Sequence, residues 1–236
     1  MERPRLLLVP QLTELEWPIR SELERWADVA AFDAPGVGST PPAPRFGREA
    51  IADEALAVLD RRGWQRCVLV ADEFGSATAA LIAHQRPGAV RAIALGHPCL
   101  SLRIGGERPS INAEVQKLLG RLVHTSYRMF ARHLTQVTQG AYDDAVADAY
   151  VERVPMEISI AFYESMLDEE PPIGETLAEL DVPLLFARHE GCLMFTPEGW
   201  EDAVMAFPHA EVVTTAQKPS GSPAFAEALR AFCAGL

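Results

Sequence analysis

The chain has 236 residues, of which 48% are hydrophobic and 23% charged, and its formal net charge is −12 at pH 7. This length and composition predict one large globular domain, with or without an insertion, that can bury a full core. The acidic charge and the lack of clustered Lys and Arg argue against nucleic acid or an anionic membrane as a partner, because both need concentrated positive charge.

Two further features bear on the cellular compartment. The apolar run before Pro10 covers only a few residues, which is too short for the hydrophobic part of a secretory signal, and no apolar stretch is long enough to span a bilayer. The four cysteines are dispersed without a C-x-x-C pair, so we expect free thiols in a cytoplasmic protein. They are Cys67, Cys99, Cys192 and Cys233.

Short apolar runs alternate with helical patterns along most of the chain. This alternation predicts an α/β fold with a mainly parallel central sheet that is flanked by helices. Near-continuous apolar strands are expected where helices cover both faces of a sheet. The predicted strands span residues 5–9, 28–32, 66–71, 90–95, 183–187 and 210–215. The predicted helices between them lie around residues 48–62, 76–86, 197–206 and 223–235.

Residues from about 100 to 175 interrupt the alternation. Apolar residues recur at helical spacing through residues 111–134, and two more helical patterns follow near 142–153 and 156–168. We therefore predict a helical cap over residues 100–175, inserted into a core domain formed by residues 1–99 and 176–236.

Several segments resemble a known family. FDAPGVGST (32–40) follows an early strand and resembles the D-x-x-G-x-G-x-S loop of α/β-hydrolases. VLVADEFGSATAALIA (68–83) resembles that family's strand, nucleophile elbow and following helix. LDVPLLFARHEG (180–191) and the closing residues 210–232 resemble its last strands and terminal helix. These segments cover nearly the whole chain in the family's order, so the resemblance implies an α/β-hydrolase-like fold with a cap.

The resemblance places Glu73 at the apex of the elbow, where a serine hydrolase has its nucleophile. The turn is so tight that the residues two before and two after the apex must be small. Ala71 and Gly75 satisfy this requirement around Glu73. If Ser76 were the apex instead, larger residues would stand at both positions, so we read Ser76 as part of the first helical turn.

The remaining hydrolase machinery also departs from the family pattern. The family's general base follows the last strand, commonly as Gly-His, whereas this chain has Gln217 and Lys218 there. Glu190 is the only carboxylate near the position of the family's acid. Residues 9–11 (Val-Pro-Gln) replace the His-Gly that many relatives carry beside the oxyanion hole, and proline has no backbone N–H. The sequence therefore does not support Ser-His-Asp chemistry.

Sites in open α/β sheets form beyond the carboxyl ends of the strands. His97 ends the strand expected beside the elbow strand, and His189 ends the next strand over. Neighbouring strands lie about 4.8 Å apart, so His97 is within reach of Glu73. The candidate catalytic residues are Glu73, His97, His189 and Glu190. The candidate substrate-binding residues are Gln11, Asp72, Phe74 and Gln217.

These residues lead to two hypotheses of different class. The first is an enzyme acting on a small apolar metabolite, in which Glu73 is a general acid or base, with His97 as its partner, in lyase, isomerase or cyclase chemistry. Hydrolysis through Glu73 as a carboxylate nucleophile ranks lower, because the usual histidine that would activate water is missing. The second is a catalytically silent protein that binds a small ligand or a protein partner.

A metal site is a third hypothesis. Asp72, Glu73, His97, His189 and Glu190 are suitable residue types, but no local ligand spacing supports such a site. We therefore expect no metal and no cofactor. The sequence leaves the oligomeric state open.

Overall fold

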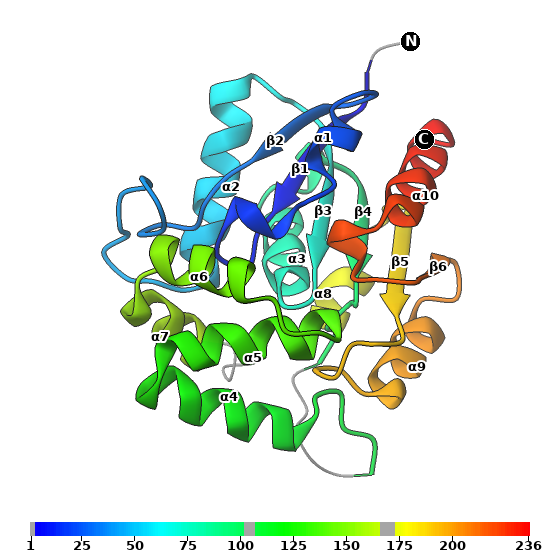
Figure 1. Ribbon diagram of the computed structural model, residues 1–236. Helices are drawn as coiled ribbons and strands as arrows, with labels where there is room; N and C mark the ends of the chain where they lie inside the picture. The colour runs from blue at the N-terminus through cyan, green and yellow to red at the C-terminus, as the bar shows by residue number, and fades with distance from the viewer. Residues whose placement is uncertain (1–2, 102–106, 166–172) are drawn as a thin grey trace.

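Six parallel strands form one sheet at the centre of the molecule, in the order β2-β1-β3-β4-β5-β6 (Figure 1). The computed structural model describes residues 3–101, 107–165 and 173–236. The strands are β1 (Arg5–Val9), β2 (Asp28–Ala31), β3 (Cys67–Asp72), β4 (Val90–Gly96), β5 (Leu184–His189) and β6 (Glu211–Thr215). Each predicted strand is present, and its ends agree to within two residues. The parallel α/β sheet is confirmed.

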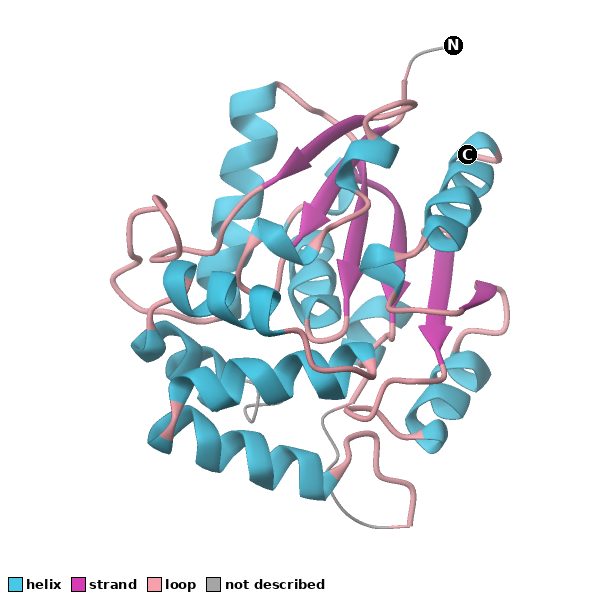
Figure 2. Ribbon diagram, viewed as in Figure 1, coloured by secondary structure: helices cyan, strands magenta, loops and turns pink. Residues whose placement is uncertain are grey.

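Helices cover both faces of this sheet (Figure 2). One face carries α2 (Arg48–Arg62), α3 (Gly75–Gln85), α8 (Ile173–Ala178) and α9 (Pro197–Ala206), and the other carries α1 (Arg20–Leu23) and α10 (Pro223–Ala234). In β1, Leu7 and Val9 belong to the core on the α3 side, whereas Leu6 and Leu8 belong to the core on the α10 side. Burial on both faces explains why the strands are almost continuously apolar.

Four helices between β4 and β5 lie together beyond the carboxyl ends of the strands, drawn in green in Figure 1. They are α4 (Ala113–Thr125), α5 (Tyr127–Gln139), α6 (Asp144–Arg153) and α7 (Met156–Ser165). The helical pattern predicted over residues 111–134 is divided in the structure, because Ser126 has extended backbone angles (φ −157°, ψ 88°). This break lets α5 lie beside α4, so that both helices bury apolar residues. The end of the last predicted helix, residues 166–168, lies outside the described residues.

An ion pair ties these helices to the core. Arg153 of α6 donates to Asp33 Oδ2 at 2.5 Å, and Asp33 Oδ1 accepts the Thr13 hydroxyl at 3.1 Å. Asp33 thus joins the loop after β1, the loop after β2 and α6. Short 3-10 helices follow β1 and β6: η1 (Glu14–Glu16) and η3 (Pro219–Gly221). A third, η2 (Pro87–Ala89), precedes β4.

The cysteines and the helices meet two expectations from the sequence. All four cysteines are free, with Cys67 and Cys99 buried and Cys192 and Cys233 half-buried. Among the described residues, every helix is too short or too polar to cross a bilayer.

Candidate functional site

Glu73 occupies the turn between β3 and α3. β3 ends at Asp72 and α3 begins at Gly75, and Glu73 between them has a φ of +52°, which is unusual for a residue other than glycine. Its backbone N–H donates to Gly96 O at 2.7 Å, which fixes the turn against β4. A Cβ atom at Gly75 would lie 3.3 Å from Val9 O, so the turn also requires a small residue two positions later.

The Glu73 carboxyl group is almost completely buried, with 1% of the residue exposed. Its Oε2 accepts Gln11 Nε2 at 2.8 Å and Lys218 Nζ at 3.2 Å. Its Oε1 has no hydrogen-bond partner among the described residues. Burial raises the pKa of Glu73 to about 7, although the charge of Lys218 opposes this rise. The carboxyl group therefore changes protonation near neutral pH.

Lys218 lies among three buried carboxyl groups. Its Nζ is 3.2 Å from Glu73 Oε2 and 4.0 Å from Asp72 Oδ2, and the third carboxyl group is that of Glu16. Burial alone would lower the pKa of Lys218, but the three carboxylates outweigh it and raise the pKa above its ordinary value. Lys218 is therefore charged, and with all three carboxyl groups ionised the cluster carries two excess negative charges.

The Glu16 carboxylate binds the backbone of the loop after β1. It accepts the N–H groups of Gln11, Leu12 and Thr13 at 2.8, 2.9 and 3.1 Å. With Thr13 as N-cap it forms a capping box at η1. Serine hydrolases of the α/β class take one oxyanion-hole donor from a loop after a neighbouring strand. In this chain an internal carboxylate already holds the N–H groups of the corresponding loop.

A cavity of about 750 Å³ lies between Glu73 and the helices α4–α7. Gln11, Glu73 and Lys218 form its polar end, and the predicted substrate-binding residues Phe74 and Gln217 also line it. Asp72 instead accepts the Ser220 N–H at 3.2 Å. The helices contribute a largely apolar wall that includes Leu119, Phe130, Leu134, Tyr150, Phe162 and Tyr163. This cavity can hold a small molecule with a polar group at Glu73 and an apolar body.

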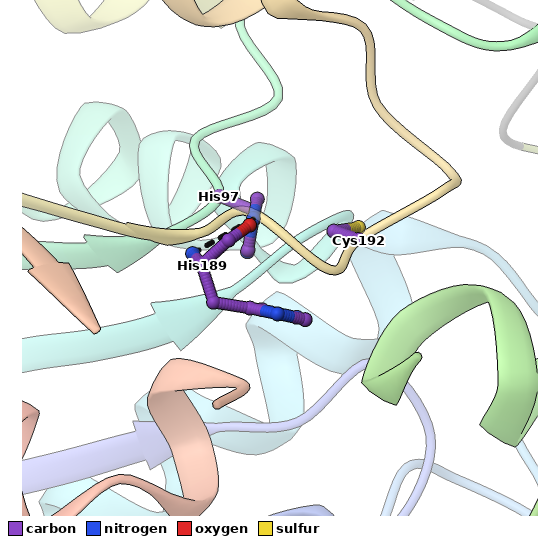
Figure 3. Close-up of side chains that lie close together, drawn as sticks. All are labelled: His97, His189 and Cys192. Atoms are coloured by element: carbon purple, nitrogen blue, oxygen red, sulfur yellow. Dashed lines mark hydrogen bonds between the residues drawn. The ribbon is translucent and has the colours of Figure 1, made fainter. Parts of the chain in front are cut away.

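The two predicted histidines lie against each other (Figure 3). His97 Nε2 lies 3.0 Å from the backbone oxygen of His189, and the rings meet edge to face with centroids 4.9 Å apart. The expected pairing of His97 with Glu73 is therefore corrected, because the Glu73 carboxyl group bonds to Gln11 and Lys218 instead. The reason is the backbone of His97, whose φ of +42° turns the residue toward β5.

Both imidazoles are neutral at neutral pH. Burial lowers the pKa of His97 to about 4, and it also lowers the pKa of His189. The two rings line a second cavity of about 640 Å³, together with Cys192 and the exposed Glu190. The predicted catalytic residues are thus divided between two cavities, with Glu73 in one and His97, His189 and Glu190 in the other.

Sequence reasoning did not propose roles for Lys218 and Glu16. Lys218 lies in the segment after the last strand, where the resemblance would place a base. This position is the feature of the sequence that could have indicated a role for Lys218. Glu16 is the last residue of T-x-x-E, the pattern of a capping box. Neither signal shows that the two side chains converge, because they lie far apart in the chain.

Comparison with known proteins agrees with this architecture. No protein-family model matches the chain, and no curated protein matches it by sequence search. Among solved structures, it is similar to a hydrolase from Oleispira antarctica (14% identity, TM-score 0.81) and to the enol-lactonase from Burkholderia xenovorans (17%, 0.79). It is also similar to a bromoperoxidase from Bacillus anthracis (15%, 0.80). Each alignment covers 99% of this chain and 92% of the other. The chain has the α/β-hydrolase fold.

Proposed function

We propose that the protein is an enzyme in which Glu73 transfers protons to and from a small, uncharged, largely apolar molecule. One observation carries the proposal: a buried carboxyl group with a pKa of about 7 lines a cavity of about 750 Å³. A group that changes protonation near the working pH is suited to general acid–base catalysis.

The contacts of Glu73 assign different roles to its two oxygen atoms. Gln11 and Lys218 hold Oε2, so Oε1 is the atom that accepts or returns a proton. The ionised form of Glu73 acts as a base and the protonated form as an acid. Near pH 7 both forms are populated, which suits isomerisation, elimination or cyclisation.

The charge of the site restricts the substrate. Lys218 is already surrounded by the carboxyl groups of Glu73, Asp72 and Glu16, so its charge is neutralised. An anionic substrate would be repelled from this end of the cavity, because the excess charge there is negative. The favoured substrate is neutral, with its polar group at Glu73 and its apolar part against α4–α7.

Hydrolysis through Glu73 as nucleophile is less well supported. That route forms an ester, and a base must then activate water to release the product. His97 Nε2 and His189 Nε2 both contact backbone carbonyl oxygens, and neither histidine lines the cavity of Glu73. The N–H groups of residues 11–13 are bound to Glu16 and do not face an oxyanion.

This last contact also favours a second candidate function. A carboxylate on the loop after β1 occupies donors that an acyl-transfer enzyme of this fold uses in catalysis. In a catalytically silent protein the cavity would bind a ligand, and Glu73 and Lys218 would be a structural ion pair. We keep this function as the alternative.

Deuterium exchange tests the choice without knowledge of the product. The wild-type protein is incubated in D₂O with a panel of small neutral metabolites, and incorporation of solvent deuterium is followed by NMR and mass spectrometry. For a molecule that exchanges, Glu73→Gln should lower the rate by about a hundredfold or more. The same variant should keep the thermal shift that this molecule causes.

Glu227→Gln is the matched control, because Glu227 is exposed on α10, on the other face of the sheet. It should leave the exchange rate unchanged. Exchange that survives in Glu73→Gln would contradict acid–base catalysis by Glu73. Binding without exchange across the panel, at equal affinity in both variants, would favour the silent protein.

A further inference from the structure

Three potential metal ligands converge at the second cavity (Figure 3). His97 follows β4, His189 ends β5, and Cys192 lies in the loop that follows β5. The ligand atoms of these residues all lie within 4.8 Å of one another. The metal site considered from the sequence did not include Cys192. Its carboxylates, Asp72, Glu73 and Glu190, are not part of the cluster in the structure.

The hydrogen bonds of the two imidazoles define which nitrogen is free. His189 Nε2 lies 2.8 Å from Thr138 O, a carbonyl oxygen that only accepts, so Nε2 carries the proton and Nδ1 a lone pair. His97 Nε2 lies 3.0 Å from His189 O and 3.2 Å from His189 N. The N–H contact requires a lone pair on Nε2 and the carbonyl contact requires the proton there, so the two contacts correspond to different tautomers of His97. His189 Nδ1 presents a lone pair, and a metal ion at His97 Nδ1 selects the tautomer in which Nε2 donates to His189 O.

This arrangement is the one that metal-binding histidines adopt. Such histidines donate the N–H of the other ring nitrogen to a carbonyl or carboxylate, which fixes the tautomer and the orientation of the ring. Here the two acceptors are the backbone carbonyls of His189 and Thr138.

His97 has two energetically unfavourable features. The residue is 7% exposed, its φ is +42°, and its Nδ1 is buried without a hydrogen-bond partner among the described residues. Buried polar atoms are nearly always partnered, and strained backbone persists where the surrounding structure requires it. A ligand at Nδ1 accounts for both features.

Cys192 completes the cluster, and the backbone N–H groups of Met194 and Phe195 bond to its sulfur. Burial raises the pKa of this thiol to about 12, so a metal ion that binds Sγ displaces the thiol proton. The negative charge of Glu73 acts on Cys192, and that of Asp72 acts on both histidines, with Lys218 opposing. The surrounding carboxylates thus favour a cation beside the thiol.

We propose that His97, His189 and Cys192 bind one Zn²⁺ ion through the two Nδ1 atoms and Sγ, with a fourth position open to the cavity of about 640 Å³. Two imidazoles and a thiolate select zinc over magnesium or calcium, which prefer oxygen ligands. Bonds of 2.0–2.3 Å place tetrahedral ligands roughly 3.5 Å apart, so a small rotation of the side chains closes the site. The proposal does not rest on the function proposed for Glu73.

Cobalt substitution tests the site on the full chain. The reduced protein is freed of metal with a chelator and titrated with Co²⁺, and the near-ultraviolet band of thiolate-to-cobalt charge transfer is recorded. One equivalent should saturate the band, and Zn²⁺ should abolish it. Competition with a chromogenic chelator then gives the affinity for Zn²⁺.

Cys192→Ser should remove the band and weaken Zn²⁺ binding by roughly a hundredfold. Cys233→Ser is the matched control, because Cys233 is a half-buried thiol on α10 that lies outside the cluster, and it should behave as wild type. His189→Gln should also weaken binding, whereas His124→Gln, at an exposed position on α4, should not. Circular dichroism verifies the fold of each variant.

The competing outcomes are distinct. A wild-type protein without the band, or a band that persists in Cys192→Ser, would overturn the proposal. Several weakly bound Co²⁺ ions without a charge-transfer band would show binding to surface carboxylates only, and this result would overturn it as well.

Discussion

The two cavities at the ends of the strands differ in the chemistry of their walls. The cavity beside β1 and β3 contains Glu73 with Lys218, in a cluster where charges are close together and buried. The cavity beside β4 and β5 contains two neutral histidines and a cysteine. Residues that share one edge of a sheet therefore need not share a site, because backbone angles and neighbouring loops decide where each side chain points.

The largest effect is expected from removing the cation of the first cavity. Lys218→Met would leave the carboxyl groups of Glu16, Asp72 and Glu73 buried without a positive charge. We expect a loss of about 3–5 kcal/mol in the free energy of unfolding at pH 8. The loss should be smaller at pH 5.5, because Glu73 is then protonated. Denaturant unfolding at both pH values measures this difference.

Lys117→Met is the control for Lys218→Met, because Lys117 pairs with Glu114 on the exposed surface of α4. Such pairs contribute little to stability. If Lys218→Met cost no more than this control, the first cavity would not depend on its cation, and the contrast between the two cavities would fail.

The next effect concerns the pH dependence of stability. The pKa of Glu73 rises from 4.5 to about 7 on folding, so the folded state binds the proton more tightly. The stabilisation from this proton is complete below pH 4.5 and is lost as the pH rises through 7. Glu73→Gln removes the titration, so it should stabilise the protein by about 2–3 kcal/mol at pH 8 and little at pH 4.

Unfolding curves of wild type and Glu73→Gln between pH 4 and 8 test this expectation. The gain at pH 8 must disappear on acidification. A variant that is less stable than wild type at pH 8 would mean that the ion pair with Lys218 outweighs the cost of burying the Glu73 charge. His97, whose pKa falls from 6.5 to about 4 on folding, should lower the stability of both proteins as the pH falls below about 7, because the unfolded state then binds the proton more tightly. The difference between the two curves therefore reports on Glu73.

The smallest effects on stability are expected from substituting the N-cap residues of the helices that line each cavity. Asn112 accepts the N–H groups of Glu114 and Val115 at the start of α4, beside the first cavity. Thr196 accepts the Gly199 N–H at the start of α9, beside the second. Asn112→Ala should cost about 1 kcal/mol. Thermal unfolding of the two alanine variants compares these walls.

Thr196→Ala should cost more than Asn112→Ala, because the Thr196 hydroxyl also donates to Pro109 O. The opposite order would show that the wall formed by α4 depends on its cap more than the wall formed by α9. The pair of variants therefore compares the two cavities without altering Glu73, Lys218 or a proposed zinc ligand, although Thr196 lines the second cavity.

The order and type of the core elements follow from local features of the amino-acid sequence. Continuous apolar runs such as Leu6–Val9 predict buried strands from a few neighbouring residues. The requirement for small residues at Ala71 and Gly75 locates the turn at Glu73. The capping box at Thr13 and Glu16 is equally local. These features could be read from the chain because each depends on residues within a few positions of one another.

The composition of the site, in contrast, depends on contacts between segments that are distant in the sequence. Lys218 meets Glu73 across 145 positions of sequence, and His97 meets His189 across 92. The break at Ser126 and the turn of His97 toward β5 depend on neighbours from other elements. The reason is physical: a hydrophobic period fixes which face of an element is buried, whereas the direction of a side chain, its burial and its pKa depend on groups that only folding brings together.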